Sequence, residues 1–154
     1  MFMIIHALLG ILIASHTSSK ILILILGIVS HFILDMIPHW DGPFNREEFK
    51  RTGKAKINKL NAFLRIIDAI LVISLVYYIA GTPEDGLLIF SIFSALLPDI
   101  IKIGYITKLK NNKHYMNQLK FHAKIQKDAD WRLGLIIQLI IALIIIYLIP
   151  SVIL

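Results

Sequence analysis

The 154-residue sequence contains no cysteine, which excludes disulfide bonds and thiolate metal sites. Charged residues are scarce at 17% of the chain, whereas hydrophobic residues make up 57% and the mean hydropathy is +0.76. Because the apolar residues come in long blocks, the composition argues against a soluble core and for a membrane protein. The net charge is +6, but the basic residues gather in two segments between apolar blocks, so we expect no nucleic-acid partner.

Five apolar blocks predict an all-α fold, a polytopic membrane helix bundle in one transmembrane domain that covers residues 1–154. We expect about five helices, at 2–19, 21–38, 60–80, 86–105 and 133–154. The last four are long enough to cross a hydrocarbon core of about 30 Å, whereas the first either spans or re-enters. Loops fill 39–59 and 106–132, and the second loop should carry a short amphipathic helix at Tyr115–Gln126 on the cytoplasmic surface.

The charges of the connecting segments predict the orientation. Six Lys or Arg lie in the 39–59 segment and seven in the 106–132 segment, whereas the turn at Gly81–Gly86 has none. Because basic loops stay in the cytoplasm, both should lie inside, with the N-terminus inside and the C-terminus outside. We expect an integral protein, of the cytoplasmic membrane in a prokaryote, with the lipid bilayer as partner; the oligomeric state stays open.

The segment Ser30–Asp41 interrupts this apolar pattern with ionisable residues. His31, Asp35 and His39 are four residues apart, so on a helix they share one face. Ionisable groups inside a membrane segment are costly and mark functional sites. Imidazole and carboxylate are also ligands that divalent transition metals select. The segment therefore predicts part of a metal site near a membrane surface.

Four of the five apolar blocks carry an ionisable residue, and the estimated depths of these residues in the membrane agree. With a rise of 1.5 Å per residue, all of them fall in one shallow layer below the cytoplasmic face. This layer predicts a site for one or two divalent cations, with zinc as the first expectation and manganese or iron also compatible. The expected metal ligands are His6, His31, Asp35, Asp68 and Asp99.

Each of these residues also has an ordinary structural explanation. Asp68 could pair with Arg65 three residues earlier, and Asp99 could cap a helix that restarts after Pro98. His6 could be a hydrogen-bonded core residue. His31 and Asp35 could form a hydrogen-bonded pair that satisfies both side chains. The shared depth favours a joint site over these separate explanations.

Three further residues are candidates for acid or base catalysis. His39 and Asp41 follow the proline at the end of the second block, where they could complete the site, orient its ligands or simply form an interfacial loop anchored by Trp40. His122 lies on the expected amphipathic helix and could reach over the site as a ligand or general acid, or remain a solvated histidine.

The His31-x3-Asp35 pair, the segment Ile37–Asp41, the early His6 and the segment Leu97–Asp99 resemble the small membrane-bound proteins described as predicted metal-dependent hydrolases. That family is thought to be distantly similar to zinc-dependent phospholipase C and S1/P1 nucleases. The resemblance implies metal-ligand positions at His6, His31, Asp35 and Asp99, with Asp68 as a further ligand.

These observations lead to a functional hypothesis. The chain is expected to be a metal-dependent hydrolase of a phosphoester, such as an anionic lipid headgroup, at the cytoplasmic face. A bound metal would lower the pKa of a coordinated water toward about 7. His39, Asp41 or His122 would serve as acid or base. The alternatives are metal-ion transport and a non-catalytic membrane scaffold whose polar groups specify helix packing.

Overall fold

The computed structural model describes residues 1–54, 58–81, 84–106 and 108–150, and the described residues are helical apart from turns, loops and one bridge between His39 and Asp128. The α-helices are α1 Met3–Ala14, α2 Lys20–Asp35, α3 Arg46–Thr52, α4 Lys59–Ile79, α5 Asp85–Lys102, α6 Lys113–Ile125 and α7 Trp131–Leu148. Two 3-10 turns, η1 Ile103–Ile106 and η2 Lys108–Asn111, follow α5.

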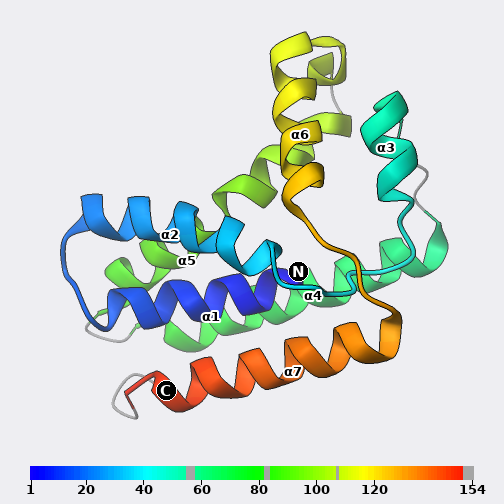
Figure 1. Cartoon of the computed structure of the whole chain (residues 1–154). Helices are drawn as coiled ribbons and strands as arrows, with labels where there is room; N and C mark the ends of the chain where they lie inside the picture. The colour runs from blue at the N-terminus through cyan, green and yellow to red at the C-terminus, as the bar shows by residue number, and fades with distance from the viewer. Residues whose placement is uncertain (55–57, 82–83, 107, 151–154) are drawn as a thin grey trace.

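Five of these helices form the body of the molecule, and two project from it (Figure 1). α1, α2, α4, α5 and α7 run along one another, whereas α3 and α6 stand to one side, near the N-terminus. The chain reverses direction after each body helix. The starts of α1, α4 and α7 and the ends of α2 and α5 therefore lie at one end of the body, which we call the basic end because the two Lys- and Arg-rich segments leave from it.

The all-helical prediction is confirmed for the described residues, but the count of five membrane helices is not. Three helical segments are long and apolar enough to span a membrane: Lys59–Ile79, Asp85–Tyr105 and Trp131–Leu148. α1 has 12 residues and α2 has 16, which gives lengths of about 18 and 24 Å at 1.5 Å per residue. The expected helix at 133–154 includes residues 151–154, which lie outside the described part of the chain.

Local chemistry explains the shortening. Ser19 is the N-cap of α2, because its side chain accepts a hydrogen bond from the backbone N–H of Leu22, and its extended backbone prevents the first helix from reaching residue 19 as expected. At the other end α2 stops at Asp35, three residues before Pro38, whose ring disfavours helix in the residue before it. The expected amphipathic helix at 115–126 is present as α6, whereas α3 was not predicted.

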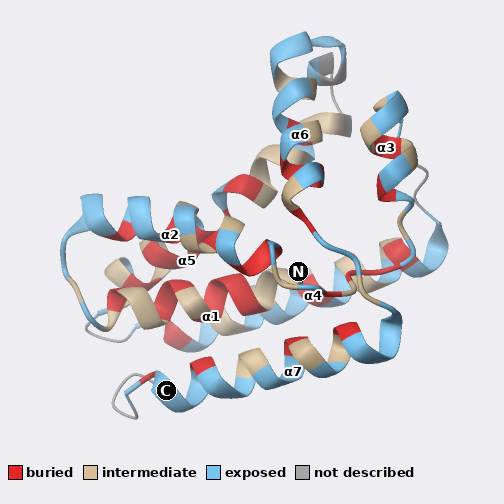
Figure 2. Cartoon of the chain, viewed as in Figure 1, coloured by how far each residue is buried: buried red, intermediate tan, exposed pale blue. Residues whose placement is uncertain are grey.

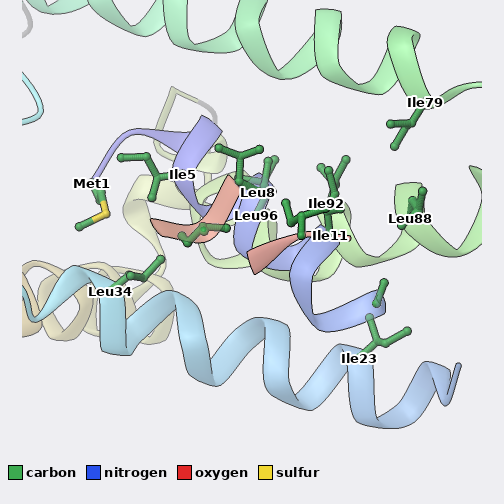
Figure 3. Packing of buried hydrophobic residues seen from close by; sticks show 14 residues of the cluster. Met1, Ile5, Leu8, Ile11, Ile23, Leu34, Ile79, Leu88, Ile92 and Leu96 are labelled. Carbon is green, nitrogen blue, oxygen red and sulfur yellow. The ribbon is translucent and has the colours of Figure 1, made fainter. Parts of the chain in front are cut away.

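α1 lies at the centre of the body. It packs against α2, α4, α5 and α7, and more than half of its residues are buried (Figure 2). Figure 3 shows the core that results, in which side chains of α2, α4 and α5 lie against those of α1. The labelled residues of this core are Met1, Ile5, Leu8, Ile11, Ile23, Leu34, Ile79, Leu88, Ile92 and Leu96.

Small residues let α1 and α2 approach α5 closely. A Cβ atom added to Gly10 would lie 2.7 Å from the backbone oxygen of Ser91, and one added to Gly27 would lie 3.0 Å from the backbone nitrogen of Ala95. Neither position has room for a larger residue without a shift of α5. Small side chains at helix contacts are typical of membrane bundles.

The outer faces of the long helices are apolar. Large hydrophobic side chains stay exposed along α4 and α7, and Figure 2 shows α7 exposed along most of its length. Examples are Phe63, Ile70, Ile73, Leu139 and Leu143. Continuous exposed apolar surface of this kind is compatible with direct contact with a lipid bilayer.

Candidate metal centre

Asp35, the last residue of α2, lies at the centre of a cluster of imidazoles at the basic end. Its side chain is fully buried. His122 Nε2 on α6 is 2.7 Å from Asp35 Oδ2. His6 Nε2 on α1 is 3.4 Å from Asp35 Oδ1, and His39 Nε2 is 3.8 Å from the same oxygen. The Asp35 carboxylate on α2 thus contacts side chains from α1, from α6 and from the loop that follows α2.

His31, one turn before Asp35, is oriented by its second ring nitrogen. Its Nδ1 lies 2.8 Å from the backbone oxygen of Ala95. Because a carbonyl can only accept, Nδ1 donates, and Nε2 is the atom that faces the cluster. Nε2 lies 3.5 Å from Asp35 Oδ2, 3.4 Å from His122 Nε2 and 3.7 Å from Asp99 Oδ1. A histidine that binds metal through one nitrogen and donates the other to a backbone carbonyl has this arrangement.

His6 stacks on His31 with ring centroids 3.9 Å apart. Its side chain is fully buried, and neither ring nitrogen has a hydrogen-bond partner of acceptable geometry among the described residues. The 3.4 Å approach of His6 Nε2 to Asp35 Oδ1 is therefore not a well-directed hydrogen bond. A buried imidazole without partners is costly unless another group binds it.

Asp99 completes the cluster from α5. Pro98 lies inside this helix, so the alternative in which Asp99 caps a restarted helix is wrong. Besides its contact with His31, Asp99 Oδ1 accepts a hydrogen bond of 2.5 Å from the Lys102 ammonium. The carboxylate is thus shared between the cluster and a cation one turn away.

The three catalytic candidates lie at or beside this cluster. His122 contacts Asp35 directly. His39 donates its Nδ1 proton to the backbone oxygen of Ile37 at 2.8 Å, so its Nε2 faces the cluster and accepts a hydrogen bond from the Met1 ammonium at 2.5 Å. Asp41 is different: it accepts hydrogen bonds from Arg46 at 3.2 Å and from Arg65 at 2.7 Å. Its carboxylate is neutralised by two guanidinium groups and does not join the imidazoles.

The surroundings set the pKa values of these three groups. Burial, together with the amino group of Met1, lowers the pKa of His39 to about 4. Burial lowers the pKa of His122 as well, although its hydrogen bond to Asp35 opposes the change. Burial raises the pKa of Asp41, but the Met1 amino group and the two arginines outweigh it and hold this pKa well below its usual range. At pH 7 Asp41 is therefore charged and His39 is neutral.

Asp68 is placed apart from the cluster. Its two oxygens accept hydrogen bonds from the backbone N–H groups of Met3 and Ile4, at 2.7 and 3.0 Å. These are N–H groups of the first turn of α1, which have no partner within the helix. Asp68 on α4 thus caps α1, and Arg65 pairs with Asp41 instead. We leave Asp68 out of the proposed ligand set.

Sequence reasoning missed several groups that hold the cluster in place. The Gln126 side chain donates to Asp35 Oδ2 at 2.7 Å, and the amino group of Met1 donates to Asp35 Oδ1 at 2.8 Å. Gln138 on α7 accepts from the backbone N–H of Phe2 and donates to the Trp40 carbonyl. The position of Gln126, four residues after a histidine on the same helix face, was the available signal.

A divalent metal fits this donor set. Zinc binds nitrogen and oxygen ligands at about 2.0–2.2 Å, so two ligands of one ion lie within about 4 Å of each other. Two groups of three residues have all their ligand atoms within 4.8 Å of one another, which is somewhat wider than this limit and would reach it through small side-chain shifts when an ion is bound. They are His6, His31 and Asp99, and His31, Asp35 and His122. His31 belongs to both groups.

The chain matches no protein-family model, no curated protein and no solved structure.

Proposed function

We propose that this protein is a membrane-embedded, metal-dependent hydrolase of phosphoesters. The observation that carries the proposal is the orientation of His31, whose Nδ1 is fixed on the Ala95 carbonyl while Nε2 faces two carboxylates and a second imidazole. A salt bridge or a packing contact requires no such arrangement, whereas a metal ligand commonly has it. The resemblance to predicted metal-dependent hydrolases is consistent with the same residues.

Each histidine and aspartate then has a role. His31, with His6 and Asp99 or with Asp35 and His122, would hold the metal, and zinc suits this set of nitrogen and oxygen donors. A bound divalent metal supplies a water of lowered pKa and polarises a phosphoryl oxygen. Gln126 would keep Asp35 in place through its hydrogen bond to Oδ2.

His39 is one candidate for a proton acceptor. Its Nδ1 proton is engaged by the Ile37 carbonyl, so the lone pair is at Nε2, where it accepts a hydrogen bond of 2.5 Å from the Met1 ammonium and would serve as a base only once that ammonium is displaced. The pKa of about 4 keeps the ring neutral at pH 7 but also makes it a weaker base than an ordinary histidine. His122 is the alternative, although its contact with Asp35 suits a metal ligand equally well.

We also propose that the basic end faces the cytoplasm, with the N-terminus inside and the C-terminus outside. The support is the charge of the two segments that leave this end, which together carry thirteen of the sixteen Lys and Arg residues of the chain. Anionic lipid headgroups at this surface would be attracted by about 1 kcal/mol for each nearby basic residue.

Metal content tests the function. Elemental analysis of detergent-purified protein should find zinc, manganese or iron near stoichiometry in the wild type. The metal should be lost from His31→Ala and Asp35→Asn, which remove a ligand or the centre of the cluster. His16→Ala is the matched control, because His16 is an exposed histidine just beyond the far end of α1. A wild type that stays metal-free after reconstitution would leave a helix-packing scaffold as the better explanation.

A further inference from the structure

A cavity of 410 Å³ lies beside the metal centre, between α3, α6 and the basic ends of α4 and α5. Its volume is in the range of small-molecule binding sites. Asp99, a proposed metal ligand, forms part of its wall, so a molecule in the cavity would lie next to the metal centre. We call this space the lateral cavity.

The cationic side of the lateral cavity consists of Arg46, Arg65 and Lys102. Two carboxylates also line it, Asp41 between the arginines and Asp99 beside the lysine. Asp128 also pairs with Arg46 from outside the cavity, so the three cations are matched by three carboxylates and the wall is close to neutral. An arginine has five N–H donors, so a guanidinium that already binds a carboxylate still has donors for a second anion.

Two buried donors in this wall have no acceptor. Arg46 Nε and Asn61 Nδ2 are both shielded from solvent, and neither has a hydrogen-bond partner among the described residues. The two residues are 3% and 5% exposed. Buried N–H groups in folded proteins are nearly always hydrogen-bonded, because an unsatisfied one is costly. Their presence in one cavity indicates that an acceptor-rich group belongs there.

The opposite side of the cavity is apolar. Phe44 and Phe49 come from α3 and the loop before it, Leu119 from α6, and Ile100 and Ile103 from the end of the apolar segment Asp85–Tyr105. Ile103 is 62% exposed, so this wall continues onto the outer surface of a helix that is long and apolar enough to span the membrane. A hydrocarbon chain could pass from the cavity to the bilayer along this surface.

We propose that the lateral cavity binds a lipid phosphate, with its phosphate group on Arg46, Arg65 and Asn61 and its hydrocarbon chain along the apolar wall. A phosphate supplies several strong acceptor oxygens, which match the two unpaired donors, and its negative charge suits the guanidinium groups that carry the remaining donors. That this lipid is the substrate of the metal centre rests on the proposed function, whereas its binding in the cavity does not depend on the metal.

Binding to metal-free protein tests this proposal separately from catalysis. Native mass spectrometry of chelator-treated protein would measure the binding of a single-chain lipid phosphate monoester. The comparison ligands are the choline lipid with the same chain and inorganic phosphate. We expect the lipid phosphate to bind at least tenfold more tightly than either, because only this ligand combines the dianionic group and the chain.

Variants then locate the binding. Asn61→Asp keeps the size of the side chain but replaces the unpaired donor with a negative charge, so it should weaken binding at least tenfold. Arg65→Gln should do the same, although loss of its ion pair with Asp41 could also lower the stability. Asn61→Asp avoids this difficulty, because its Nδ2 has no partner to lose. Arg51→Gln is the control, because Arg51 is an exposed residue of α3 that does not line the cavity.

The outcomes are distinguishable. Equal binding by wild type and Asn61→Asp would overturn the lateral cavity as the site, even if the protein holds metal. Equal binding of the choline lipid would overturn phosphate recognition, and equal binding of inorganic phosphate would overturn the role of the chain. Conversely, Asn61-dependent binding by a protein that never takes up metal would support the cavity and refute the hydrolase.

Discussion

The capping role of Asp68 leads to a quantitative prediction, because a metal ligand and a helix cap respond differently to Asp68→Asn. The carboxylate, only 2% exposed, accepts hydrogen bonds of 2.7 and 3.0 Å from two N–H groups at the start of α1. Asparagine keeps one acceptor oxygen but loses the negative charge, and its NH2 group faces an N–H that then has no acceptor.

The expected loss of stability is about 2 kcal/mol. Hydrogen bonds to a charged group contribute about 1.5–3 kcal/mol, and helix caps contribute about 0.5–2 kcal/mol. For a chain of this size, 1 kcal/mol corresponds to about 2–4 °C, so the melting temperature should fall by about 4–8 °C. Metal content should stay at the wild-type level, because the hydrogen bonds of Asp68 go to the backbone of α1 and not to the cluster residues.

Thermal unfolding and elemental analysis of the same detergent-purified samples measure both quantities. Asp85→Asn is the matched control: Asp85 also accepts from a backbone N–H, that of Gly81, but this hydrogen bond is exposed and its loss should change stability by less than about 0.5 kcal/mol. An Asp68→Asn protein with an unchanged melting temperature and no metal would refute the capping argument and make Asp68 a ligand.

Two further predictions concern packing and charge. Gly10→Ala should lower the free energy of unfolding by about 1–3 kcal/mol, because its Cβ would lie 2.7 Å from the backbone oxygen of Ser91. Gly86→Ala is the control and should not destabilise the protein, because the space around Gly86 is open. Equal melting temperatures for the two variants would contradict this packing. Asp41→Asn should lower the free energy of unfolding by about 2–3 kcal/mol, since it removes the anion shared by Arg46 and Arg65 and leaves only Arg46 with another carboxylate, that of Asp128. A melting temperature unchanged by Asp41→Asn would show that the ion pairs contribute little.

The composition and periodicity of the chain predicted the helices but not their lengths. The long apolar blocks at 60–80 and 86–105 correspond closely to α4 and to α5 with η1, since a segment of about 20 mostly apolar residues has few alternatives to a helix. The lengths of the helices in the first two blocks were overestimated. Hydropathy does not register the N-cap at Ser19, where α2 begins, or the effect of Pro38 on the end of α2.

The candidate site was predicted in part for a similar reason. The spacing of His31, Asp35 and His39 fixes one helix face, and the estimated depths of His6 and Asp99 brought them to the same level. The structure brings these residues together with His122. Depth alone could not distinguish Asp68, which lies at a similar level but faces the start of α1.

The sequence by itself determined that the chain is helical, that its long apolar segments suit a membrane and that ionisable residues gather near one end of them. These properties depend on composition and on spacing along one helix, which are local. The tertiary structure decided which of those residues meet. The rotation of each helix about its axis and the partners of α6 depend on packing between distant segments, such as Gly10 against Ser91 and Gln126 against Asp35. Contacts of this kind place Asp68 at the start of α1, away from the proposed metal centre, and form the lateral cavity.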